Sequence, residues 1–256
     1  MMMVREAVVS SVRCALAVAL VAFVAAGVPA QSAPADARAV AVRAAALLDA
    51  DRHGVIATVT DASESIEAPI YHQQSRSRFW VVSENGVAEA AGYLLEEENG
   101  KLKPHDELVK DSAAYDATVK KHTLTLHSAL RAEFQSEYRY ADAPCDGCAD
   151  GERAIRYESD KRDAAHTNGT IVVDASGHVV RTITQPYVYP QFINDGGDFT
   201  TRYGVVLDGK RLPVATIGAY HGHRGPMKGS ENFEQRFSYK RFASVDEAVA
   251  ATKLPG

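Results

Sequence analysis

Basic residues do not predominate in this sequence. Its 256 residues include 28 lysines and arginines against 33 aspartates and glutamates, which gives a formal net charge of −5. A protein that coats nucleic acid needs a basic surface, because it must displace the counterions of the phosphate backbone. We therefore expect no nucleic-acid partner.

Long apolar runs are also scarce, and the one clear example lies near the start. Residues 14–27 carry no charge, Arg5 and Arg13 precede them, and small residues follow at Val28 and Ala30. This order is typical of a secretory signal peptide, and the run is short for a membrane span of ~20 residues. We predict that residues 1–30 are a cleaved signal peptide and that the protein is exported, either periplasmic or extracellular. Residues 31–256 are predicted to form a single domain without a transmembrane segment.

Common catalytic motifs are missing. The sequence holds neither the Gly-x-Ser-x-Gly elbow of hydrolases nor the His-Glu-x-x-His pair of zinc proteases. Residues 204–211, "GVVLDGKR", approach a phosphate-binding loop, but Arg211 replaces the Ser or Thr that would hold magnesium. We predict no nucleotide, no cofactor and no catalytic residues.

Helical patterns occur in three places. Residues 35–50 have one apolar face, residues 105–133 lack Gly and Pro, and residues 244–253 begin with a capping-box pattern formed by Ser244 and Glu247. In the middle segment, the residues expected to face inward are Leu108, Tyr115, Val119, Leu126 and Leu130.

Strand patterns fill most of the remaining chain and are separated by turn residues. Asn85-Gly86 and Asn99-Gly100 tolerate the positive φ of tight hairpins, and Asp208-Gly209 has the same character. Neighbouring strands joined by short turns must be antiparallel. The sequence therefore predicts an α+β fold, a single curved antiparallel sheet (a half-barrel) with helices at the N-terminus, in the middle and at the C-terminus.

Two cysteines, Cys145 and Cys148, form a Cys-x-x-Cys pair that has three interpretations. A redox pair should begin a helix, whose dipole lowers the thiol pKa, yet a turn and a strand pattern follow here. A zinc site needs two further ligands at matched spacing. A local disulfide fits the predicted export, because an oxidising compartment allows it to form. We predict the disulfide and leave the other two readings open.

The clearest histidine pair is His221 and His223 in "AYHGHRG". Two residues apart on a strand, their side chains would share a face and could chelate a metal. Without an acidic residue at short matched spacing they are weak metal candidates, and we assign no metal site.

The second half of the chain resembles a known family. The residues that carry the likeness are a hairpin from Gly169 to Gly177, a bend at Pro186 and Pro190, a hairpin closing in Leu212-Pro213 and a last strand ending near Phe242. This order, over roughly residues 130–243, is similar to that of the exported lipoprotein-sorting factors of the LolA/LolB-like superfamily. The resemblance implies a half-barrel closed by helices over an apolar cavity.

The favoured hypothesis is therefore an exported, non-enzymatic binding or carrier protein that shelters an apolar, lipid-like or acylated ligand. An envelope interaction or structural protein without a small ligand is the alternative, and a hydrolase or redox enzyme on the same scaffold is a weaker one. Strand alternation and the expected cavity between sheet and helices give the candidate cavity-lining residues Trp80, Val172, Ile183 and Val205.

Overall fold

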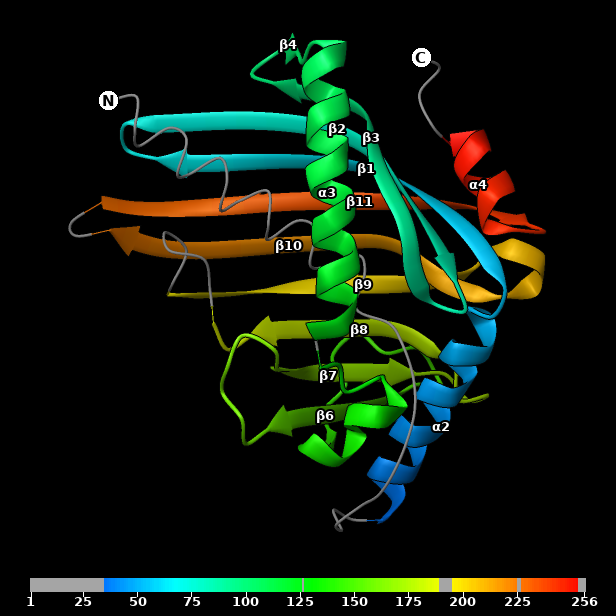
Figure 1. The fold of residues 1–256 in the computed structure, drawn as a ribbon. Coiled ribbons are helices and arrows are strands. Elements are labelled where there is room, and N and C mark those ends of the chain that lie inside the picture. Colours follow the sequence, from blue (N-terminus) through cyan, green and yellow to red (C-terminus); the bar gives the residue numbers. More distant parts are fainter. Residues whose placement is uncertain (1–34, 126, 189–194, 225–226, 253–256) are drawn as a thin grey trace.

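A curved sheet crossed by helices dominates the fold of the computed structural model (Figure 1), which describes residues 35–125, 127–188, 195–224 and 227–252. The predicted signal peptide lies outside the described residues, as do Leu126 and Pro190. Within the described part, no helix is both long and apolar enough to cross a membrane.

The helices lie where the sequence predicted them. They are α2 (Ala35–Asp51), α3 (His105–Thr125) and α4 (Val245–Thr252), with the short 3-10 helices η1 (Ala132–Glu137) and η2 (Leu207–Gly209). At the start of α4, the Ser244 hydroxyl accepts a hydrogen bond from the Glu247 N–H at 3.2 Å, and the Glu247 carboxylate accepts one from the Ala243 N–H at 3.1 Å. This arrangement is close to the predicted capping box.

All strands of the described chain belong to one antiparallel sheet of 11 strands, in the order β4-β3-β2-β1-β11-β10-β9-β8-β7-β6-β5. Their bounds are β1 Val55–Ala68, β2 Tyr71–Glu84, β3 Val87–Glu98, β4 Lys101–Leu102, β5 Tyr138–Ala143, β6 Arg153–Ser159, β7 Thr167–Val173, β8 Val179–Pro186, β9 Gly196–Val205, β10 Arg211–Arg224 and β11 Met227–Phe242. The predicted fold class, a curved open antiparallel sheet with three helices, is confirmed.

The hairpin turns use the residues that the sequence indicated. Asn85 and Asn99 have φ of 51° and 50°, and the glycines after them also have positive φ. Two successive residues at positive φ are the signature of a type I′ turn, which matches the twist of the flanking strands. These turns fix the registers of the β2–β3 and β3–β4 hairpins.

Helices α2 and α3 cover the same face of the sheet, which we call the helix face. Phe79 and Val81 of β2 pack with Tyr115 and Val119 of α3 on this face. Further along the sheet, α2 packs against β5–β9 in a second cluster, in which Ile155 and Ile171 are fully buried. Four of the predicted inward residues, Leu108, Tyr115, Val119 and Leu130, are buried.

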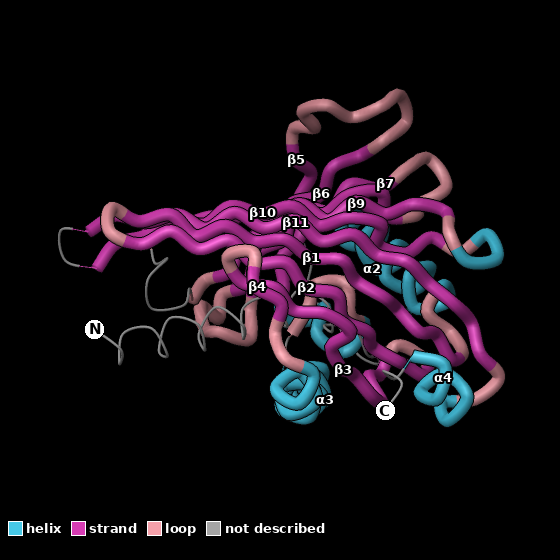
Figure 2. Tube along the Cα trace, turned by 90° about the horizontal axis from the view of Figure 1, so that it is seen from above, coloured by secondary structure: helices cyan, strands magenta, loops and turns pink. Residues whose placement is uncertain are grey.

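Helix α4 lies on the opposite face, which we call the outer face. Trp80 and Val82, which alternate with Phe79 and Val81, pack with Ala248 of α4. Figure 2 shows α3 and α4 on either side of β3. The same stretch of β2 therefore contributes to two separate apolar clusters, one on each face.

Helix α3 joins the two edges of the sheet. It follows β4, which is one edge strand, and leads through η1 into β5, which is the other. Its 21 residues span about 31 Å at 1.5 Å per residue, and the helix crosses the strands (Figure 1). The crossover thus connects the two edge strands, β4 and β5, which lie at opposite ends of the sheet.

Candidate functional site

A groove of about 820 Å³ lies on the outer face and crosses β2, β1, β11, β10, β9 and β8. The strand registers place its side chains in three cross-strand rows. The first row contains Arg181, Arg202 and Ala215; the second contains Ile183, Thr200, Ile217, Glu234, Ser63 and Arg76; the third contains Asp198, Ala219, Asn232, Ser65 and Gln74. Antiparallel pairing thus assembles one surface from residues that are scattered over the sequence.

Two arginines face each other directly at one end of the groove. Arg181 of β8 pairs in register with Arg202 of β9, so both side chains project from the outer face. Within the described residues neither guanidinium forms an ion pair with a carboxylate, and the Nε of Arg181 is buried without a hydrogen-bond partner. Like charges directly opposite each other destabilise a sheet. This end of the groove is therefore suited to an anion.

Two other charged residues of the groove, Arg76 and Glu234, have ion-pair partners. Arg76 lies 4.0 Å from the Glu97 carboxylate, and Glu234 accepts a hydrogen bond from Arg236 at 2.7 Å. Asp198 is four residues from Arg202 on the same strand, a separation of about 13 Å along an extended chain. Among the described residues of the groove, the positive charge without an ion-pair partner is thus at Arg181 and Arg202, and the acidic Asp198 lies towards the other end of the groove.

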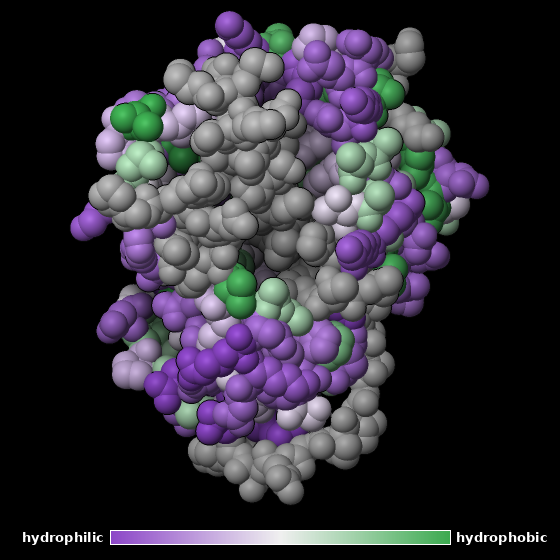
Figure 3. Space-filling view, turned by 60° about the vertical axis from the view of Figure 1, so that its left-hand side comes forward, coloured by the Kyte–Doolittle hydropathy of each residue, from purple (hydrophilic) through white to green (hydrophobic). Residues whose placement is uncertain are grey.

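An apolar strip continues from the arginine pair. Ile183 and Ile217 lie in the second row, Ala215 and Ala219 flank Ile217 on β10, and Ile217 is 49% exposed. An isoleucine this exposed in the middle of a wide sheet leaves apolar area in contact with water, which another apolar group could cover. Among the coloured residues in Figure 3, hydrophilic ones predominate and the hydrophobic ones are scattered.

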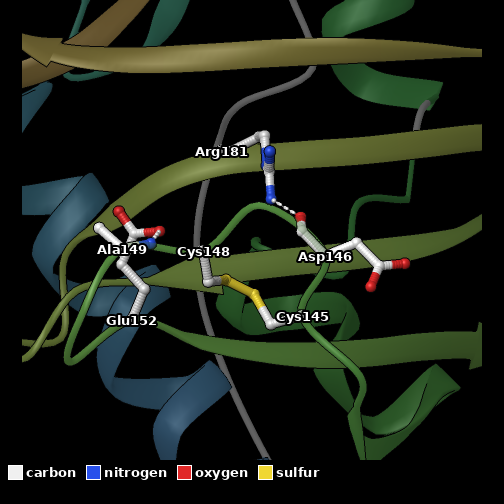
Figure 4. The surroundings of a disulfide bond; sticks show 6 residues. All are labelled: Cys145, Asp146, Cys148, Ala149, Glu152 and Arg181. Carbon is white, nitrogen blue, oxygen red and sulfur yellow. Dashed lines mark hydrogen bonds between the residues drawn. A yellow bond between two sulfur atoms is a disulfide. The ribbon is translucent and has the colours of Figure 1, made fainter.

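The β5–β6 loop borders the groove beside the arginine pair. Cys145 and Cys148 are disulfide-bonded in this loop, with a Cα–Cα distance of 5.5 Å. The neighbouring Asp146 carbonyl accepts a hydrogen bond from Arg181 Nη2 at 3.1 Å (Figure 4). The loop therefore reaches β8 at the arginine end of the groove.

We expect the Cys145→Ser, Cys148→Ser double variant to lose about 1 kcal/mol of unfolding free energy, less than the usual ~2–4 kcal/mol, because the closed loop is very short. Arg181 keeps its charge in this variant, so we also expect anion affinity to fall by about threefold or less. Denaturant unfolding and ligand titration measure the two effects. Two alkylatable thiols in the untreated exported protein would contradict the disulfide itself.

The four predicted cavity residues are not brought together. Ile183 lines the groove, whereas Trp80 lies on the same face but is buried at 5% exposure with α4. Val172 is buried and pairs in register with Arg181 on the far side of the arginine pair, and Val205 is 63% exposed at the end of β9. The cavity was expected between the sheet and the helices, yet the groove lies on the opposite face, because the α2 and α3 clusters fill much of the helix face.

The histidines predicted as weak metal candidates lie at one end of β10. His221 and His223 are both exposed, and alternation places them on the outer face. The Asp195 carboxylate lies 2.7 Å from His223 Nδ1. Among the described residues, the group with three potential metal ligands is a different one, His127, Glu137 and His166.

A buried carboxyl group lies on the helix face behind the groove. Glu231 of β11 is 1% exposed, and its Oε1 has no hydrogen-bond partner. Burial, together with the nearby negative charge of Glu64, raises the pKa of this carboxyl from 4.5 to about 8. At neutral pH this group is therefore mostly protonated.

Comparisons with known proteins give a resemblance of fold. No family model matches the chain, and no curated protein matches it. A crystal structure of a LolA superfamily protein from Nitrosomonas europaea is 12% identical, with 82% of this chain and 96% of that one covered and a TM-score of 0.36. The chain resembles LolA-like proteins.

Two further structures show the same kind of likeness. A DUF1329 family protein from Desulfovibrio piger is 10% identical, with 85% of this chain and 98% of that one covered and a TM-score of 0.37. MucB, solved in complex with MucA of Pseudomonas aeruginosa, gives a match at 10% identity that covers 82% of this chain and 100% of that one, with a TM-score of 0.23. The TM-scores of these three matches lie between 0.23 and 0.37.

Sequence reasoning missed the arginine pair and its role in the groove. Arg181 and Arg202 belong to different hairpins, and only the β8–β9 register makes them neighbours. The sequence did contain a signal that both arginines lie in strands. Arg181 and Arg202 stand within the strand patterns "RTI" and "TTRYG". Alternation assigns each to a face of its own strand, but it does not predict which strands pair.

Proposed function

We propose that this chain is an exported, non-enzymatic binding protein for a lipid-like amphiphile with an anionic head group. The observation that carries the proposal is the uncompensated Arg181–Arg202 pair at the end of an apolar strip in one groove. Guanidinium groups bind phosphates and carboxylates through paired N–H donors. The anionic head would contact the arginines, and the alkyl chain would cover Ile183 and Ile217.

The size of the groove supports a small ligand. Its volume of about 820 Å³ lies within the range of about 300–1,000 Å³ that is typical of small-molecule sites. Most of the lining is polar, but the apolar strip beside the arginine pair matches the two parts of an amphiphile, its alkyl chain and its charged head.

Three detergents with the same alkyl chain test this function: dodecyl phosphate, dodecyl maltoside and dodecyl trimethylammonium, each titrated below its micelle concentration by isothermal calorimetry. We expect saturable one-to-one binding of dodecyl phosphate, weaker binding of the neutral head group and the weakest binding of the cation. Equal affinity for all three would remove the anionic specificity. The absence of binding by any of them would favour the alternative, an envelope interaction protein with no small ligand.

Export is the second part of the proposal, and the signal-peptide pattern of residues 1–30 supports it. We expect intact-mass analysis of the exported protein to show a chain that begins after Ala30. Retention of residues 1–30 in that protein would contradict a cleaved signal peptide.

A further inference from the structure

Three segments of the chain converge on one carboxylate oxygen, with residues that do not line the groove. His127 follows α3, Glu137 ends η1, and His166 precedes β7. His127 Nδ1 lies 2.8 Å from Glu137 Oε2, and His166 Nε2 lies 2.5 Å from the same atom. The ligand atoms of all three residues are within 4.8 Å of one another.

The surroundings of His166 are unusual for a neutral imidazole. Its side chain is 2% exposed, and its other ring nitrogen, Nδ1, lies 2.6 Å from Asp163 Oδ1. Both ring nitrogens therefore face carboxylate oxygens, while a neutral imidazole carries only one N–H donor. Hydrogen bonds at both ring nitrogens therefore require one more proton within the cluster. A cation bound at Nε2 is the alternative, because it would take the place of one of these hydrogen bonds.

We propose that His127, Glu137 and His166 bind a divalent transition-metal ion of the Zn²⁺ class. His166 would ligate through Nε2 and donate its Nδ1–H to Asp163, the carboxylate–histidine–metal arrangement that orients many metal-bound imidazoles. His127 would ligate through Nδ1 and Glu137 through Oε2. Two imidazoles and one carboxylate form a ligand set that suits Zn²⁺ and leaves a fourth position for water.

The spacing requires only a small adjustment. Metal bonds of about 2.0–2.1 Å place tetrahedral ligands about 3.3 Å apart, and the observed separations from Glu137 Oε2 are 2.8 and 2.5 Å. The Glu137 carboxylate must therefore retreat by less than about 1 Å. Its other oxygen, Oε1, lies 3.0 Å from Lys161 Nζ and can keep that contact.

The backbone already holds the site together without an ion. The His127 N–H donates to the Ala165 carbonyl at 2.8 Å, and the Tyr138 hydroxyl donates to the His127 carbonyl at 2.5 Å. The imidazole of His127 stacks on Phe134 with ring centroids 3.8 Å apart. Ligands that are fixed before the metal arrives lose less freedom on binding. Since the His127 and Glu137 side chains remain 27% and 20% exposed, solvent can reach the site.

The test uses the whole exported protein, without further truncation, after treatment with a chelator, and Zn²⁺ alone as the probe. We expect one equivalent of Zn²⁺ to bind by calorimetry and to raise the melting temperature. The stoichiometric binding should be lost in Glu137→Gln and in His127→Ala. Asp163→Asn should keep the site but lower its affinity by about tenfold or more, because Asp163 orients His166.

The matched control is the double variant His221→Ala, His223→Ala, which removes two exposed histidines outside the site and should bind Zn²⁺ like the natural chain. No Zn²⁺ binding by the natural chain, unchanged binding in Glu137→Gln, or loss only in the control variant would each overturn the proposal. If a ligand variant fails to fold, Co²⁺ added to the natural chain decides the question. Strong visible bands of four- or five-coordinate Co²⁺ support the site, and the weak spectrum of hexahydrated Co²⁺ overturns it.

Discussion

Replacing both Arg181 and Arg202 with glutamine is expected to weaken binding of dodecyl phosphate by about 100-fold. A hydrogen bond to a charged group contributes about 1.5–3 kcal/mol, and 1.4 kcal/mol corresponds to a tenfold change in affinity. Because Arg202 is exposed, we take the low end of this range, which gives about tenfold for each single variant. Calorimetric titration of the two single variants and the double variant measures the effect.

The matched control is Arg78→Gln. Arg78 lies in the same cross-strand row on the outer face, but it is paired with Asp61 at 2.7 Å and does not line the groove. We expect it to leave dodecyl phosphate affinity unchanged. An equal loss in Arg78→Gln and Arg202→Gln would show that affinity follows net charge rather than the groove. Folding stability gives a second readout, because relief of the Arg181–Arg202 repulsion should leave the unfolding free energy of the double variant equal or higher by a few tenths of a kcal/mol.

The second large effect is a fall in stability as the pH rises, caused by Glu231. Its carboxyl has a folded-state pKa of about 8 against an ordinary value of 4.5. Between these values the folded chain keeps a proton that the unfolded chain releases, so the unfolding free energy declines with rising pH. Below about pH 4.5 both states are protonated and the stability is fully present; above about pH 8 it is lost.

The Glu231→Gln variant should be more stable than the natural chain by about 3 kcal/mol at pH about 9, and nearly equal to it at pH about 4. The full pKa difference would give a larger value, and entry of water into the folded site reduces it. Denaturant unfolding at a series of pH values measures this difference. Glu234→Gln serves as control, since Glu234 projects from the outer face and pairs with Arg236. Parallel pH profiles for Glu231→Gln and the natural chain would contradict the assignment.

Local chemistry made much of the fold predictable. The asparagine–glycine turns, the alternation within strands and the Ser244 cap act between residues that are close in sequence, and each appeared where it was predicted. The faces of the sheet were harder to predict. Trp80 was expected in a cavity because it is apolar and lies in a strand, but α4, which follows about 160 residues later, packs over it.

The candidate sites depend on contacts that sequence patterns do not encode. Arg181 and Arg202 are cross-strand neighbours by register alone. His127, Glu137 and His166 are 10 and 29 residues apart, and each belongs to a different connecting segment. The sequence did reveal the histidine pair His221 and His223, because these two residues are close in sequence. Short spacing alone does not supply the third ligand that a metal site needs.

The pairing of the first long strand with the last has a consequence for how the chain folds. β1 pairs with β11 through 13 register positions between Val55 and Phe242, so the centre of the sheet joins segments nearly 190 residues apart. Two runs of neighbouring hairpins, β1–β4 and β5–β11, can each form early, but each keeps an open edge until they meet. Contacts of such long range slow folding, and unpaired edges expose the chain to aggregation. Refolding should therefore be slow for a chain of this length. When the chain is synthesised from its N-terminus, the sheet stays incomplete until β11 has been made.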